Sequence, residues 1–189
     1  MSTPSGPAWC TRFPTSRSLE DLDASWRPSV KRFFRALSAA GASINVAATL
    51  RPWQRAWLMH YACLVAGYRG PHNAFIQLDP MSVPARAELD IDWTHGGDRG
   101  AAISAAVAMR NAFAIVFPPA LDSLHTKGLA VDIDIQWAGP LSIARADGSI
   151  SAINSQPANG LNPELWLVGK TYGVVKLPSD APHWSATGH

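Results

Sequence analysis

Three short segments of the chain concentrate residues that can bind a metal or move a proton: residues 49–54 (TLRPWQ), 123–134 (SLHTKGLAVDID) and 179–184 (SDAPHW). In the second segment His125 precedes a Lys-Gly turn, and Asp132 lies on an expected strand beyond that turn. The chain can therefore fold back and bring an imidazole and a carboxylate to one site. Nitrogen and oxygen ligands of this kind suit zinc.

The third segment adds a further ligand and a free carboxylate. Asp180 and His183 are three residues apart, and a bend at the intervening proline can point both side chains into one cleft. His125, Asp132 and His183 would leave one zinc position for water, which is typical of a catalytic site. Asp180 is then the candidate general base that takes the proton of this water.

Arg51 lies at the junction between an expected strand and an expected helix. Its guanidinium can hold a substrate carboxylate, or the oxyanion of a tetrahedral intermediate, by a charge-assisted hydrogen bond. A lysine would do this less well, because it lacks the planar fork of donors.

In their order and spacing, the three segments resemble a zinc peptidase family. It contains the vancomycin-resistance D-Ala-D-Ala dipeptidases and carboxypeptidases and the L-alanyl-D-glutamate endolysins of bacteriophages. The family pattern is an Arg before a Gln-bearing helix, Ser-x-His with six residues before an Asp, and an acid shortly ahead of a His-aromatic pair. The matching positions here are Arg51 with Gln54, Ser123 with His125 and Asp132, and Asp180 with His183 and Trp184. The match covers roughly residues 46–184, although residues 67–97 have no counterpart.

The resemblance implies a role for each matching residue. It implies that His125, Asp132 and His183 bind one zinc ion and that Asp180 is the catalytic acid and base. Arg51 would stabilise the substrate or the transition state. The expected substrate contacts are Arg51, Gln54, Ser123 and Trp184.

Three of the matching positions need a further remark. No Gly-x-Ser-x-Gly elbow surrounds Ser123, so we expect it to steady its loop by a hydrogen bond rather than to act as a nucleophile. Trp184 can line the substrate cleft or belong to the core. Many carboxypeptidases of the family carry Glu where this chain has Asp180, and the phage endolysin branch commonly has Asp.

The resemblance therefore predicts a zinc peptidase that cleaves the L-Ala-D-Glu type of bond in the stem peptide of bacterial peptidoglycan. An alternative is a D-Ala-D-Ala carboxypeptidase. Another is a zinc-bearing cell-wall binding protein without turnover, as in the hedgehog signalling domain. The start of the chain has no secretory signal pattern. We therefore expect synthesis in the cytoplasm, release by a holin or a secretion machine, and action on the wall in the periplasm or outside the cell.

No chemistry is assigned to the remaining polar candidates. His60 belongs to a predicted helix, while His72, His95 and His189 lie in loop or terminal sequence and are expected to be solvated. Asp134, two residues after Asp132, is expected to lie near the metal or to accept a hydrogen bond in its surroundings.

Length and composition fit a globular chain with one core. The chain has 189 residues, of which 47% are apolar and 16% charged, and it has no apolar run that could cross a bilayer. The net charge of +2 comes from scattered residues, so no basic stripe indicates nucleic acid as a partner. We expect a flexible arm over residues 1–18 and a single catalytic domain over residues 19–189.

Hydrophobic spacing predicts the elements that must position the site. The predicted class is α+β, with helices packed on a small, mainly antiparallel sheet that carries the zinc site. Residues 67–97 are expected to form a long loop with a short strand near residues 89–93. We expect helices over 21–40, 52–65, 98–112 and 163–172, strands over 42–50, 129–137 and 174–177, and a hairpin of 141–144 with 150–153.

Overall fold

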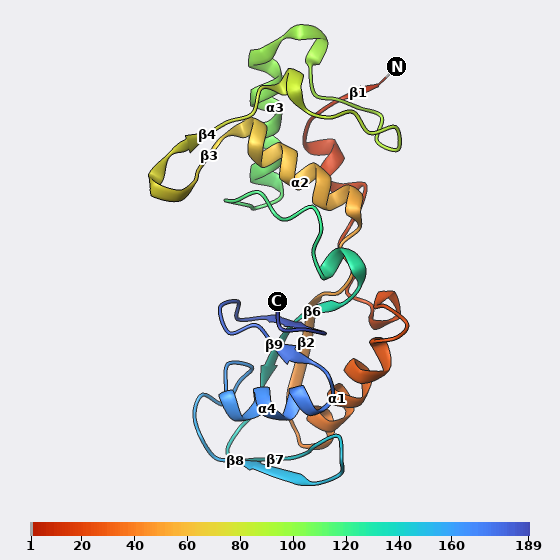
Figure 1. Ribbon diagram of the computed structural model, residues 1–189, viewed down its shortest axis with the longest axis vertical. Coiled ribbons are helices and arrows are strands. Elements are labelled where there is room, and N and C mark those ends of the chain that lie inside the picture. The colour runs from red at the N-terminus through yellow and green to blue at the C-terminus, as the bar shows by residue number, and fades with distance from the viewer. Residues whose placement is uncertain (1) are drawn as a thin grey trace. The chain divides into compact units, whose positions relative to one another are not determined.

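The computed structural model describes residues 2–189. By their contacts, these residues form two compact units. The first comprises the residues up to Pro14 and Pro52–Asp122, and the second comprises Thr15–Arg51 and Ser123–His189. Four α-helices and mainly antiparallel strands make up the regular structure of the described residues (Figure 1), so the predicted α+β class is confirmed.

The second unit is built on a four-stranded antiparallel sheet with the order β2-β6-β10-β9. Its strands are β2 (Ser43–Ala48), β6 (Ala130–Gln136), β10 (His183–Ser185) and β9 (Val175–Lys176). The central strand β6 alternates between two faces: Val131, Ile133 and Ile135 are buried, whereas Asp132 is half-buried on the opposite face. One face of the sheet is therefore available for polar chemistry, while the other builds the core.

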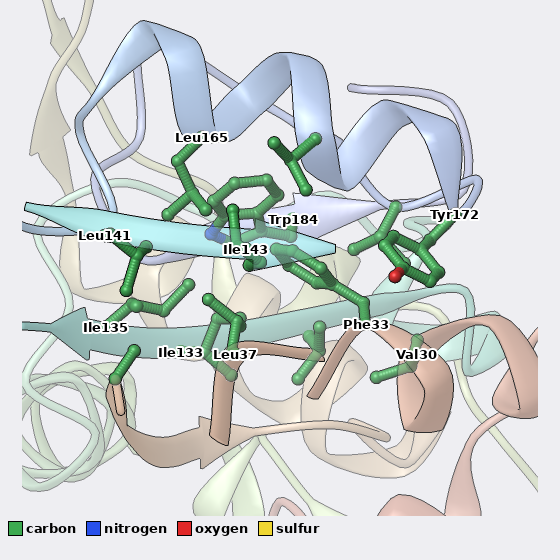
Figure 2. Close-up of a cluster of buried hydrophobic side chains, with 14 of the residues drawn as sticks. Val30, Phe33, Leu37, Ile133, Ile135, Leu141, Ile143, Leu165, Tyr172 and Trp184 are labelled. Atoms are coloured by element: carbon green, nitrogen blue, oxygen red, sulfur yellow. The ribbon is translucent and has the colours of Figure 1, made fainter. Parts of the chain in front are cut away.

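Two helices and a hairpin cover the apolar face. They are α1 (Arg27–Ala39), α4 (Pro163–Thr171) and the hairpin of β7 (Leu141–Ala144) with β8 (Ile150–Ile153). Figure 2 shows their side chains meeting those of β6 and β10 in one cluster that includes Val30, Phe33, Leu37, Ile133, Ile135, Leu141, Ile143, Leu165, Tyr172 and Trp184. The apolar positions of α1 recur at helical spacing, which is why this helix buries one face.

The first unit has a separate core between α2 (Trp53–Ala66) and α3 (Arg99–Ala112). Asp98 caps the N-terminus of α3, because its Oδ1 accepts a hydrogen bond of 2.9 Å from Ala101 N. Two short strand pairs accompany the helices: β1 (Thr3–Pro4) with β5 (Ile91–Asp92) in parallel, and β3 (Tyr68–Arg69) with β4 (Phe75–Ile76) in antiparallel orientation.

Six 3-10 turns complete the described elements. They are η1 (Pro7–Thr11), η2 (Leu19–Asp21), η3 (Pro71–Asn73), η4 (Pro80–Ser82), η5 (His95–Gly97) and η6 (His125–Lys127). None of the helices in the described part of the chain combines the length and apolarity that a bilayer crossing requires.

The described part of the expected flexible arm over residues 1–18 contains β1, η1 and contacts with the first unit. Trp9 lies in η1 with only 3% of its surface exposed and packs into the core of the first unit. Its Nε1 donates to Pro4 O at 3.0 Å, and Arg55 Nη1 donates to Cys10 O at 2.8 Å. Burial of this large indole stabilises the packing of η1 on the core of the first unit. The flexibility of the arm over residues 1–18 stays a prediction. The single domain over residues 19–189 stays a prediction.

Candidate metal centre

Three potential ligand atoms converge at one point of the second unit. His125 Nε2 lies 3.1 Å from Asp132 Oδ1 and 3.2 Å from His183 Nδ1, and His183 Nδ1 lies 3.2 Å from the same Asp132 oxygen. The three atoms thus form a nearly equilateral triangle. Tetrahedral zinc with bonds of about 2.0–2.1 Å would place its ligand atoms about 3.3–3.4 Å apart, so the triangle has nearly the required size.

Hydrogen bonds on the far side of each ring determine which nitrogen faces this point. His125 Nδ1 donates to Thr49 O at 2.8 Å, and His183 Nε2 donates to the main-chain oxygen of His189 at 3.0 Å. Because a carbonyl oxygen can only accept, both outer nitrogens carry a proton. In the neutral rings the two inner nitrogens therefore present lone pairs, as metal-binding histidines do.

Three electron-rich atoms facing one another at these distances repel unless a positive charge lies among them. A neutral hydrogen-bond network cannot supply it, since each neutral imidazole has already used its only proton on a main-chain oxygen. The group formed by His125, Asp132 and His183 can therefore hold a metal ion. Two imidazoles and one carboxylate suit a divalent transition metal.

The pKa values reflect the same demand for positive charge. Burial opposes ionisation of Asp132, but the two imidazoles, which donate to this carboxylate and carry a positive charge when they are protonated, outweigh it and hold its pKa well below the ordinary value. Burial lowers the pKa of His183, and the hydrogen bonds to Asp132 and His189, with the charges of Asp132 and Asp180, raise it above the ordinary value. A proton on His183 thus serves the same electrostatic purpose as a metal.

The sheet register brings two of the ligands together. Asp132 on β6 and His183 on β10 are direct cross-strand partners, so their side chains project from the same face. The neighbours Val131 and Trp184, which also pair with each other, project into the core. One pair of strands thus fixes both ligand positions.

The turn η6 supplies the third ligand. It ends at Gly128, whose φ of +69° belongs to the left-handed region. A Cβ there would lie 2.8 Å from Asp23 N, so glycine is required on both counts. Ser123 steadies the same turn as expected, because its Oγ accepts from Thr126 N at 3.3 Å. His125 is thereby presented with only 5% of its surface exposed.

Arg51 is hydrogen-bonded through its main chain to the turn that carries His125. Its main-chain N donates to His125 O at 3.0 Å, and its side chain is half-buried. Burial lowers the pKa of Arg51, and the nearby charge of Asp132 raises it. The guanidinium therefore lies close enough to Asp132 for the two charges to interact.

Asp180 is exposed in the loop that connects β9 to β10. Its charge reaches His183 and contributes to the raised pKa of that ring. Its main-chain oxygen accepts a hydrogen bond from His183 N at 3.1 Å, so the loop ties the candidate base to a candidate ligand.

The structure differs from the sequence analysis at Trp184. This residue is fully buried, and its ring lies 5.5 Å from that of Phe33 in the core. A contact with substrate is excluded by this burial, because residues that follow one another in a strand face opposite sides of the sheet. Gln54 lies at the second position of α2 in the first unit, and its predicted substrate contact stays a prediction.

Lys176 is a buried residue of this region that the sequence analysis did not single out. Only 4% of its surface is exposed. Burial lowers its pKa, and the charges of Asp180 and Asp132 raise it, so the ammonium lies within electrostatic reach of the candidate centre. Nothing in the sequence around Lys176 indicates burial, since its partners are main-chain oxygens.

Among the other polar candidates, His95 differs from the expectation of a solvated residue, because it is half-buried and its Nε2 lies 2.9 Å from Ser5 Oγ. Asp134 and His60 have the structural roles expected of them. Asp134 is exposed and accepts a hydrogen bond of 3.4 Å from Asn45 Nδ2. His60 on α2 donates from Nδ1 to Pro119 O at 2.8 Å. No protein-family model matches the chain, and a search of curated proteins finds no significant relative.

Proposed function

We propose that the chain is a zinc-dependent peptidase that cleaves the stem peptide of bacterial peptidoglycan. The observation that carries the proposal is the convergence of two imidazole nitrogens and a carboxylate oxygen within 3.1–3.2 Å of one another, with both outer ring nitrogens already bonded to main-chain oxygens. Such a site can hold a metal ion, and three protein ligands would leave a coordination position for water or substrate.

The metal is proposed to be zinc, held by His125, Asp132 and His183. The same donor set also suits ferrous iron. Zinc is favoured by the ionisable groups around the ligands, namely the exposed carboxylate of Asp180 and the guanidinium of Arg51. These are groups for proton transfer and anion stabilisation, as hydrolysis requires.

Each nearby residue then has a defined task. Zinc, when bound, supplies a Lewis acid that polarises the scissile carbonyl and lowers the pKa of water. Asp180, which is exposed and close to His183, accepts a proton from the attacking water and later delivers it to the leaving amine. Arg51 stabilises the negative charge that develops on the substrate, or holds its terminal carboxylate.

The choice of substrate rests on the resemblance of residues 49–54, 123–134 and 179–184 to the peptidoglycan peptidases. Asp at position 180 favours the endopeptidase branch, with cleavage of the L-Ala-D-Glu type of bond. We further propose that the protein acts on the wall in the periplasm or outside the cell, and that a holin or a secretion machine releases it.

The test is the release of free amino groups from purified peptidoglycan. We expect activity from the wild type and loss of activity after chelation, with recovery on addition of zinc. An Asp180→Asn variant should lose about 100-fold or more in rate while still binding zinc, because general acid-base catalysis is worth about 10²–10⁴-fold. Asp134→Asn is the matched control. It should retain activity, because Asp134 is an exposed carboxylate of the same strand that bonds to Asn45 rather than to a candidate ligand.

The products separate the alternatives. Mass spectrometry of the released fragments distinguishes an internal cut from the release of terminal D-Ala by a carboxypeptidase. A wild-type protein that binds zinc and walls of every type tested but releases no amino groups would contradict the proposal and indicate a binding protein.

A further inference from the structure

The ammonium of Lys176 lies at the centre of the loop that carries the candidate base and one candidate ligand. Its Nζ donates to the main-chain oxygens of Leu177 at 2.5 Å and His183 at 3.2 Å, and also to that of Asp180. The side chain is buried, with 4% of its surface exposed. Burying an ammonium is costly unless all its hydrogens are bonded, and here three hydrogens meet three acceptors.

The same three oxygens also close the loop through the main chain. Leu177 N donates to His183 O at 3.2 Å, Asp180 N to Leu177 O at 3.2 Å, and His183 N to Asp180 O at 3.1 Å. Each oxygen thus accepts one amide hydrogen and one ammonium hydrogen, and both lone pairs of each are used. The ammonium and the three amides form one closed network.

Lys176 approaches this network from the core side of the sheet. It is the cross-strand partner of Trp184, and its Nζ lies 5.9 Å from the centre of the Trp184 ring. Directly opposed residues of a strand pair project from the same face, whereas Asp132 and His183 project from the other one. Lys176 therefore acts on the centre through the main chain rather than by contact with metal or substrate.

We infer that Lys176 is a positioning residue, which holds the loop from Leu177 to His183 in the conformation that aims His183 at the metal and Asp180 at the substrate. The inference rests on the metal centre of the proposed function. Two of the three oxygens that the ammonium clamps belong to Asp180 and His183 themselves, so displacement of the ammonium moves these residues first. Partners of this indirect kind are worth about 10–100-fold in metal affinity at other sites.

The experiment compares Lys176→Met, Lys176→Gln and the control Lys170→Met, which alters an exposed lysine of α4. Zinc affinity is measured by competition with a chromophoric chelator, and ligand geometry by the visible spectrum of the cobalt-substituted protein. We expect Lys176→Met to lose about 10–100-fold in zinc affinity and to change the cobalt spectrum. Lys176→Gln keeps two donors and should lose less, and Lys170→Met should match the wild type.

A purely structural lysine would give a different result. Lys176→Met would then melt at a lower temperature but would bind zinc with wild-type affinity and show an unchanged cobalt spectrum, which would overturn the inference. Affinity is measured without substrate. Zinc binding without peptidase activity would thus contradict the proposed hydrolysis alone, whereas a wild type that binds no metal would overturn both.

Amide hydrogen exchange in the metal-free wild type tests the inference without any variant, should Lys176→Met fail to fold. The amides of Asp180 and His183 lie inside the clamped loop, and we expect NMR to show them protected before metal is added. Rapid exchange of these two amides in the metal-free protein would show that the loop is not held in advance, and would overturn the inference.

Discussion

Each imidazole of the candidate centre is held through both of its ring nitrogens. The inner nitrogens of His125 and His183 face Asp132, and the outer ones donate to main-chain oxygens of Thr49 and His189. The outer bonds fix the tautomer and the ring orientation, which is how proteins prepare histidines for a metal. Main-chain oxygens, and not side chains, therefore orient the two imidazoles of the centre.

Arg51 allows a test at this scale. An Arg51→Gln variant should lose about 100-fold or more in kcat/KM, because removal of one donor to a developing oxyanion costs about 10²–10³-fold. Zinc content should not change, since Arg51 lies near Asp132 but is not a candidate ligand. Arg145→Gln is the control, because Arg145 belongs to the same unit and its Nη1 donates to Ser151 Oγ of β8. Equal losses in both variants, measured on peptidoglycan fragments, would argue against a role for Arg51 in the reaction.

The sequence predicted the candidate ligands but not the groups that orient them. His125, Asp132 and His183 could be predicted from the sequence because their types and spacing indicate metal chemistry, and the structure brings them together. The role of Lys176 could not be predicted from the sequence, because its partners are carbonyl oxygens, which every residue has. His189 was expected to be solvated, and its contribution is likewise a main-chain oxygen.

At the scale of elements, the alternation of two strands separates chemistry from packing. On β6 and β10 the ligands Asp132 and His183 face one side, and Val131, Ile133 and Trp184 face the core. The prediction that Trp184 contacts substrate was wrong for this reason. The alternation itself was visible in the sequence, and applying it to the residue after His183 would have placed Trp184 in the core.

The contact between α4 and β10 can be tested with two helical glycines. A Cβ at Gly169 of α4 would lie 2.7 Å from Trp184 Cζ3 and 2.8 Å from Val174 O. Gly169→Ala should therefore destabilise the protein by about 1–3 kcal/mol, as overpacking does, although alanine favours helices. Gly100→Ala in α3 meets only the Asp98 side chain at 3.4 Å and should stabilise by up to about 1 kcal/mol. Urea denaturation measures both, and equal effects of the two substitutions would contradict this packing.

Elements with a strong local signal were predicted closely. The hairpin of β7 and β8 has the predicted bounds, because alternating strands flank an Asp-Gly turn. The first helix begins at Arg27 rather than at residue 21, since Leu19–Asp21 forms a separate 3-10 turn. The pairing of β3 with β4 inside residues 67–97 was not predicted, because strands of two residues are too short to show a period.

At the scale of the whole molecule, the candidate centre is assembled from distant parts of the chain. The second unit, formed by Thr15–Arg51 and Ser123–His189, contains all residues of the centre. These are Thr49, Arg51, His125, Asp132 and His183. Hydrophobic periodicity gives local structure, but it does not say which distant segments share a core. The division into two compact units was therefore not predicted, whereas the α+β class was.

The central claim is that this unit holds one zinc ion through His125, Asp132 and His183. The most direct test is the zinc content of the zinc-loaded and desalted protein, measured by inductively coupled plasma mass spectrometry. His183→Gln and His60→Gln form a matched pair, because His60 lies on α2 and donates to Pro119 O. We predict about one zinc ion per chain in the wild type and in His60→Gln, and less than about a tenth of that in His183→Gln. A wild type without stoichiometric metal, or a His183→Gln variant that retains it, would contradict the claim.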